Sequence, residues 1–142
     1  AAGLPLYAQH VDQLNVATLI DIFRAETDSC LLGTDAVRDG VDVPGRSLQL
    51  LAFDRIPWPR PTILHRARRD AFGGRSYDDM LARLRLAQAY GRLIRRRDDK
   101  GVFVVLDAAT PTRLFGAFPE SVVPERVGLV EAIEATEAFL AP

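Results

Sequence analysis

The feature that most constrains the fold of this chain is the alternation of short apolar runs with longer stretches of helical periodicity. Four runs are bounded by Gly, Asp or Pro and have the length of buried strands. They span residues 3–9, 28–34, 47–54 and 101–107. Apolar residues recur at helical spacing in residues 11–26, 77–97 and 128–140. This alternation predicts an α/β fold with an open, mostly parallel sheet flanked by helices.

Two segments between these elements have local signals of their own. The stretch "SYDD" at 76–79 predicts a cap and an acidic first turn for the long middle helix. The stretch "RIPWPRP" at 55–61 is too rich in proline for a helix or a central strand. We therefore expect an ordered loop there.

Length and composition set the class of protein. A chain of 142 residues is long enough for one domain with a real core, so a single domain over 1–142 is predicted. Apolar residues at 48% and charged residues at 26% are typical of globular proteins. No apolar run approaches the roughly 18 to 20 residues of a membrane span, and the start of the chain does not resemble a signal peptide. A cytoplasmic protein without a membrane partner is expected.

The small number of cysteine and histidine residues argues against a metal site. Cys30 is the only cysteine, so no internal disulfide can form, and its apolar surroundings predict a buried, inert thiol. The two histidines, His10 and His65, have no partners at ligand spacing. We predict no metal ligands in this chain.

The net charge of −1 conceals a strongly cationic middle third. Residues 55–100 contain 13 basic and 5 acidic side chains, for a local charge of +8. The segments 1–54 and 101–142 carry −5 and −4. A cationic block of this kind fits contacts with a polyanion such as the phosphates of a nucleic acid.

The first candidate site follows the second apolar run, in "GTDAVRDGVDVPG" at 33–45. Ligands of open α/β sheets bind at the carboxyl ends of the strands, which is where this segment is expected. A tight loop here would offer backbone N–H groups together with Thr34, Asp39 and Asp42. The alternative is an ordinary surface loop in which Asp42 only caps a helix or turn.

The second candidate site is "QAYGRLIRRR" at 88–97. On a helix, Gln88, Arg92 and Arg95 stand at i, i+4 and i+7 and share one face, while Gly91 allows close approach of a backbone or ligand. The planar fork of arginine binds phosphate oxygens in pairs. The alternative is a solvated basic helix end that complements the helix dipole, a role we assign to the other basic residues of this stretch.

Together these segments resemble a known family. "GTDAVRDGVDVPG", "DRIPWPRP" and "AQAYGRLIRRRDDKGVFVVLD", in this order, resemble the C-terminal RecA-like motor domain of superfamily two DNA helicases of the DinG/XPD type. The first looks like helicase motif V and the third like motif VI, with its pattern Gln, two residues, Gly-Arg, one residue, Ile-Arg. The resemblance covers about residues 6–118. It departs from the family at Val37-Arg38-Asp39, where many relatives have an aromatic residue and a glutamate.

The resemblance implies roles for six residues. Arg92 and Arg95 fall on motif VI positions that act as arginine fingers and stabilise charge on the transferred γ-phosphoryl group. Three residues fall on positions near the nucleotide and the interdomain cleft, namely Gly40, Asp42 and Gln88. Thr34 falls where the family contacts the DNA backbone.

The resemblance also implies what lies outside this sequence. The chain has no G-x-x-x-x-G-K-[ST] phosphate loop, Asp-Glu box or four-cysteine set, which belong to the first motor domain of the family. ATP and Mg²⁺ should be bound mainly by that domain, so the chain is expected to be a fragment that is inactive alone. It is also expected to lack the first strand and helix of its own domain. An uncovered sheet edge would then invite self-association.

The leading hypothesis from the sequence is therefore the second motor domain of an ATP-dependent DNA helicase. Its partners would be single-stranded DNA and the first RecA-like domain of the same parent chain, and ATP would draw the two domains together. The alternative is a non-catalytic module that binds single-stranded nucleic acid or associates with itself.

Overall fold

The computed structural model of the chain describes residues 3–43 and 45–142. The chain folds as two compact units, Ala1–Gln49 with Arg92–Gly101 and Leu50–Gly91 with Val102–Pro142. Each unit contains helices and one pair of short parallel strands, which confirms the predicted α/β class. The single domain over 1–142 stays a prediction.

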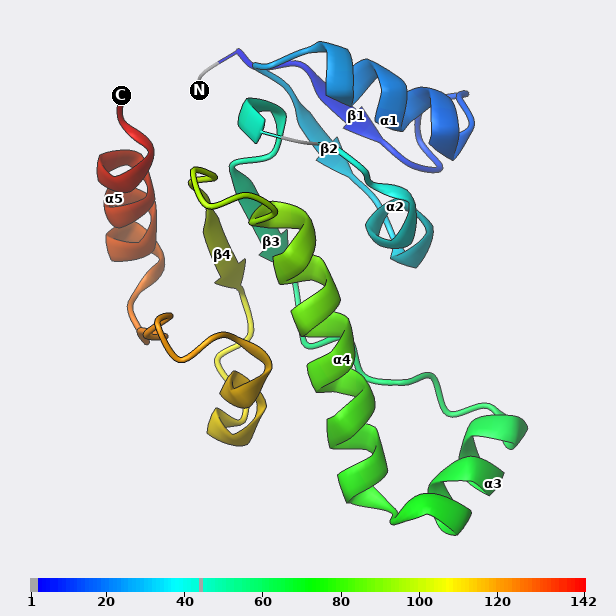
Figure 1. Cartoon of the computed structure of the whole chain (residues 1–142). Helices are drawn as coiled ribbons and strands as arrows, with labels where there is room; N and C mark the ends of the chain where they lie inside the picture. Colours follow the sequence, from blue (N-terminus) through cyan, green and yellow to red (C-terminus); the bar gives the residue numbers. More distant parts are fainter. Residues whose placement is uncertain (1–2, 44) are drawn as a thin grey trace. The chain divides into compact units, whose positions relative to one another are not determined.

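The first unit pairs two short strands and covers them with helix α1 (Figure 1). Its elements are β1 (Leu6–Ala8), α1 (Val16–Ala25), β2 (Cys30–Leu32), α2 (Asp35–Gly40) and the 3₁₀ turn η1 (Gly45–Ser47). Strands β1 and β2 run parallel, with Leu6 opposite Cys30. Helix α1 begins where the Asn15 side chain accepts the N–H of Thr18 at 2.9 Å, a typical N-cap.

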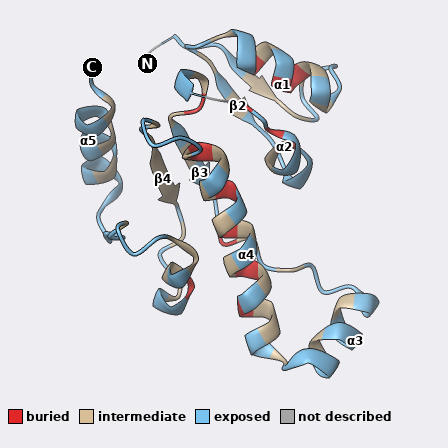
Figure 2. Cartoon of the chain, in the orientation of Figure 1, coloured by how far each residue is buried: buried red, intermediate tan, exposed pale blue. Residues whose placement is uncertain are grey.

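The core of the first unit lies along one face of α1 and continues into the segment after α2. Leu19, Ile20 and Phe23 are buried on α1, as Figure 2 shows in red. Residues 41–43 then alternate, with both valines buried and Asp42 exposed between them. An extended backbone points successive side chains to opposite sides, so burial of the two valines presents the Asp42 carboxylate outward.

The second unit is built around strands β3 and β4 and the long helix α4 (Figure 1). Its elements are β3 (Leu50–Phe53), α3 (Ile63–Phe72), α4 (Arg75–Leu93, of which the last two residues belong to the first unit), β4 (Val102–Val105), the 3₁₀ helix η2 (Thr112–Ala117) and α5 (Leu129–Leu140). The two strands run parallel in register, with Leu50 opposite Val102. Helix α3 is followed by its C-cap Gly73, whose φ of 112° is the left-handed conformation common at helix ends.

A compact hydrophobic cluster holds the second unit together. Ile56, Ala82, Leu86 and Leu114 are at most 2% exposed and pack with aromatic side chains of the two strands and the segment after η2. Phe103 of β4 contacts Phe118 edge-on at 5.1 Å between ring centroids. Burial of such side chains stabilises a fold by about 1.5–3 kcal/mol each.

Most predicted elements are confirmed, with informative differences at their ends. All four predicted strands, the three predicted helices and the loop over 55–61 are present, although each strand is shorter than its apolar run. The predicted cap at the start of α4 is wrong, because α4 begins at Arg75 and the Ser76 hydroxyl donates to the Gly73 carbonyl at 2.8 Å. The acidic first turn is confirmed by Asp78.

Two further expectations are corrected. The predicted loop over 33–45 contains helix α2, and α3 was not predicted. Cys30, expected to be buried, is exposed because its side chain and that of Leu32 lie on the open face of the short strand β2. Within residues 3–43 and 45–142, no helix is long and apolar enough to cross a membrane, and no cluster of His, Cys, Asp or Glu could hold a metal ion.

Candidate functional site

The segment 39–42 of the first unit is held by arginine side chains from two helices. Arg92, near the end of α4, donates from one guanidinium nitrogen to the carbonyl of Val41 and from the other to the carbonyl of Asp39 at 2.8 Å. Arg24, in the last turn of α1, donates to the carbonyl of Asp42 at 3.1 Å. The guanidinium fork can bridge two carbonyls in a way that a lysine cannot. These contacts define how the segment after α2 presents Asp42.

Arg95 reaches the same segment from outside the helix. Its guanidinium forms an ion pair with the Asp42 carboxylate. The arginine side chain is 33% exposed and the carboxylate 64% exposed, so the pair faces solvent. Both predicted arginines therefore contact the segment that carries two of the other predicted residues, Gly40 and Asp42.

The prediction that Gln88, Arg92 and Arg95 share a helical face is wrong for Arg95. Helix α4 ends at Leu93, and the N–H groups of Arg95 and Arg96 both donate to the Asp99 carboxylate at 2.7 Å. In a longer helix these groups would bond to carbonyls one turn earlier. The Asp99 side chain replaces those bonds and turns the chain out of the helix.

Gln88 and Gly91 lie on α4 in the second unit. Gln88 is exposed one helical turn before Arg92. A Cβ added at Gly91 would meet no atom within 4 Å, so nothing among the described residues occupies the space beside it. Five of the six predicted residues thus lie in the first unit, and Gln88 lies on the preceding turn of α4.

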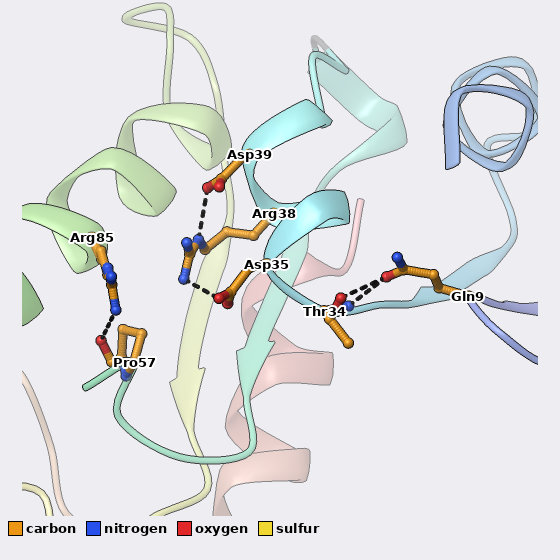
Figure 3. A network of polar contacts seen from close by, with 7 residues as sticks. All are labelled: Gln9, Thr34, Asp35, Arg38, Asp39, Pro57 and Arg85. Carbon is orange, nitrogen blue, oxygen red and sulfur yellow. Dashed lines mark hydrogen bonds and ion pairs between the residues drawn. The ribbon is translucent and has the colours of Figure 1, made fainter. Parts of the chain in front are cut away.

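Thr34 lies at the carboxyl end of β2, as predicted. Its N–H and hydroxyl both donate to the side-chain oxygen of Gln9, at 2.8 and 2.9 Å (Figure 3). Gly33, just before it, has no room for a side chain, because an added Cβ would lie 2.2 Å from the Val37 side chain. The tight packing of α2 on this turn therefore requires glycine, and Thr34 stays exposed beside it.

The charges of α2 are internally paired. Arg38 contacts the carboxylates of Asp35 and Asp39 at 3.1 and 3.0 Å (Figure 3). The Asp39 carboxylate therefore accepts a hydrogen bond from Arg38, while the Asp39 backbone carbonyl accepts one from Arg92. Gly40 follows, and a Cβ there would approach the Ile20 side chain at 3.1 Å. The carboxylate that forms an ion pair with the Arg95 guanidinium is that of Asp42.

Sequence reasoning missed Arg24 and Asp99. Arg24 gave no signal, because its contact with the Asp42 carbonyl comes from the packing of α1 beside the segment after α2. Asp99 lies in the quoted "RRRDDKG" stretch, directly after Asp98. The sequence does not indicate which of these two carboxylates accepts hydrogen bonds from the end of the helix. Both residues act on the positions of Asp42 and Arg95, and neither was assigned a role.

Replacing Asp99 by alanine is expected to lower the thermal denaturation midpoint of the chain. Hydrogen bonds from the N–H groups of Arg96 and Arg95 lower the pKa of Asp99 below its usual range. A lowered pKa in the folded state means that the stabilisation is complete above the ordinary carboxylate value of about 3.9 and is lost as the pH falls through the lowered pKa. The deficit of Asp99→Ala should therefore shrink in acid.

The matched control is Asp98→Ala, which removes the neighbouring exposed carboxylate. Asp99→Asn keeps an acceptor oxygen and should fall between wild type and Asp99→Ala. Equal denaturation midpoints for the two alanine variants at neutral pH would contradict the role given to Asp99.

Comparison with known families decides which kind of domain this is. The family described as "Helicase C-terminal domain" matches residues 1–124. The chain belongs to the helicase C-terminal domain family. The resemblance noted from motifs V and VI is thereby confirmed, and the match includes every predicted site residue.

Individual relatives place this helicase C-terminal domain in the DinG group. It is 41% identical over 117 residues to the ATP-dependent helicase DinG of Mycobacterium tuberculosis, covering 78% of this chain and 18% of that protein. It is 35% identical over 106 residues to the ATP-dependent DNA helicase YoaA of Escherichia coli, covering 70% and 17%. For the 3'-5' exonuclease DinG of Bacillus subtilis the identity is 30% over 125 residues, covering 82% and 13%.

The helicase C-terminal domain described here thus spans less than a fifth of the length of these relatives. No solved structure matches the chain.

Proposed function

We propose that this chain is the second motor domain of an ATP-dependent DNA helicase and completes an ATP site held mainly by another motor domain of its parent protein. The observation that carries the proposal is the meeting of the two candidate segments in one unit. Arg92 and Arg95 both contact the segment 39–42, so the motif VI arginines and the motif V acid form one cationic and acidic surface. Family membership and the named relatives support this reading.

The contacts favour different roles for the two arginines. Arg95 is the arginine finger, because among the described residues its partly exposed guanidinium is paired only with an exposed carboxylate that a phosphate can replace. Arg92 is committed to two backbone carbonyls and positions the segment that carries Asp42. A finger stabilises negative charge that develops on the transferred phosphoryl group, which is why its charge must be available at the site.

The remaining residues are proposed to support these two. Gly40 and Asp42 would lie near the nucleotide, and Gln88, which is exposed on α4, is proposed as a further nucleotide contact. The sequence contains no phosphate loop and no Asp-Glu box, so ATP and Mg²⁺ would be bound mainly by the first motor domain. Thr34, exposed at the end of β2, would contact the backbone of single-stranded DNA.

The test compares the parent protein with this chain. The parent should hydrolyse ATP in response to single-stranded DNA and unwind a duplex, whereas the purified chain should hydrolyse none, since it contains no phosphate loop. The alternative, a non-catalytic binding module, predicts a parent that binds single strands but neither hydrolyses ATP nor unwinds. If the purified chain hydrolysed ATP in the presence of magnesium, and Arg95→Ala abolished this turnover, the proposal that another motor domain holds most of the ATP site would be contradicted.

Self-association of the isolated chain is a further expectation of this proposal. Four large apolar side chains of α5 are at least 50% exposed, namely Leu129, Val130, Ile133 and Phe139. Exposed apolar faces of this kind drive association.

A further inference from the structure

Helices α3 and α4 form an elbow in the second unit that none of the proposed roles uses. The chain turns at Gly73 and Gly74, both with positive φ, and the two helices diverge from this turn (Figure 1). A cleft of about 530 Å³ lies at the elbow. It is lined by Arg68, Phe72, Ser76, Tyr77 and Met80. Clefts that bind small ligands have volumes of about 300–1,000 Å³, so this elbow cleft has room for one.

Two aromatic rings of the elbow, those of His65 and Phe72, contact the ring of Tyr77. His65 stacks on Tyr77, with ring centroids 5.8 Å apart and an angle of 19° between the rings. The ring centroid of Phe72 lies 5.9 Å from that of Tyr77, with an angle of 39° between the rings. Phe72 is nevertheless 67% exposed. A ring supported by a neighbour and still open to solvent is a suitable platform for another flat, apolar group.

The charge around the elbow cleft is positive. Residues 60–85 contain seven arginines and three aspartates, a formal charge of +4. The Asp78 carboxylate contacts both His65 and Arg69 at 2.7 Å, so it is already compensated. Arg68 lines the cleft, and its guanidinium has no hydrogen bond or ion pair with another described residue. The cleft therefore combines an aromatic platform with an available cation.

This pairing of groups matches a nucleotide better than an apolar peptide. Single-stranded nucleic acids are held where bases stack on aromatic rings and arginines contact the phosphates. A purely apolar partner would leave the charge of Arg68 without an opposite charge at a desolvated surface, which is costly. The charge complementarity of the elbow cleft therefore favours a polyanion that carries flat bases.

We propose that the elbow cleft binds single-stranded DNA, with Phe72 stacking on one base and Arg68 contacting a neighbouring phosphate. This site is separate from the backbone contact proposed for Thr34, and it rests on the proposed function in taking DNA as the substrate. Stacking tolerates any base, so the site would hold the strand without selecting a sequence.

The experiment compares binding of the purified chain to fluorescein-labelled oligothymidylate and to an abasic strand of the same length. The abasic strand has the phosphates but no bases, so a preference for oligothymidylate measures stacking. Phe72→Leu keeps an apolar side chain but removes the ring, and should weaken binding of oligothymidylate about tenfold while leaving the abasic strand unaffected. Phe72→Trp should retain the preference.

Two controls separate stacking from apolar contact and from charge. Ile63→Ala removes a side chain of the same helix that is 87% exposed and should change neither affinity. Arg68→Ala should weaken binding of both strands equally and reduce the salt dependence by about one phosphate contact. If Phe72→Leu and Ile63→Ala leave DNA binding unchanged but both reduce self-association measured by sedimentation, the elbow binds protein and the proposal is overturned.

The outcome can be separated from that of the proposed function. If the parent protein shows DNA-stimulated ATP hydrolysis but Phe72→Leu has no effect on the preference for bases, only the elbow cleft proposal is overturned. If the wild-type parent neither binds oligothymidylate nor responds to it in ATP hydrolysis, the proposed function fails and the elbow cleft proposal fails with it.

Discussion

Replacing Arg95 by alanine in the parent protein is expected to slow DNA-stimulated ATP hydrolysis by about 10³-fold or more, because arginine fingers contribute about 10³–10⁵ in turnover. Nucleotide affinity should be largely retained, since a finger acts on charge that develops only in the transition state. The free energy of unfolding should change by less than about 1 kcal/mol, because the ion pair with Asp42 faces solvent.

Three measurements on the same protein check this expectation. Steady-state turnover gives the loss in kcat, equilibrium titration with a nucleotide analogue gives the affinity, and thermal denaturation gives the stability. Arg97→Ala is the matched control, because it removes an exposed arginine two residues further along the same segment. Unchanged turnover in Arg95→Ala would assign Arg95 to the solvated surface and remove the finger from the mechanism.

Replacing Arg92 by alanine is expected to lower the free energy of unfolding much more than replacing Arg95 does. The variant loses two hydrogen bonds from a charged donor to the carbonyls of Asp39 and Val41. Bonds to charged groups contribute about 1.5–3 kcal/mol each. Because Arg92 is only partly buried, we expect a decrease of about 2 kcal/mol in the free energy of unfolding.

Urea unfolding of the purified chain measures this decrease, with Arg95→Ala as the comparison. Arg92→Lys should recover only part of it, since a single ammonium group does not reproduce the fork that bridges two carbonyls. In the parent protein, Arg92→Ala should also reduce turnover by releasing the segment that presents Asp42. Equal unfolding free energies for Arg92→Ala and Arg95→Ala would contradict the positioning role of Arg92.

The secondary structure could be predicted where local patterns are strong. The apolar runs correctly identified β3 and β4, and the spacing of apolar residues identified α1, α4 and α5. The patterns failed where a contact with another segment decides the local structure. Asp99 ends α4 early by binding two N–H groups, and the close packing of Val37 on Gly33 allows a helix where a loop was expected. Cys30 was placed in the core because an apolar run carries no information about whether both faces of its strand are covered.

For the candidate site, the sequence by itself determined which chemistry is present. The order of the motif V and motif VI segments, the two arginines at 92 and 95, and the acid at 42 can all be read from the chain, and so can the family. These features depend on residue type and spacing, which are local properties.

Only the tertiary structure decided which groups Arg92 and Arg95 contact. Arg92 binds carbonyls that lie 51 and 53 positions earlier in the chain, while Arg95 leaves the helix to pair with a carboxylate. Two arginines three residues apart are equivalent in sequence, but a hydrogen bond depends on distance and angle between atoms that only folding brings together. The different roles proposed for Arg95 and Arg92 therefore rest on packing between segments distant in the chain.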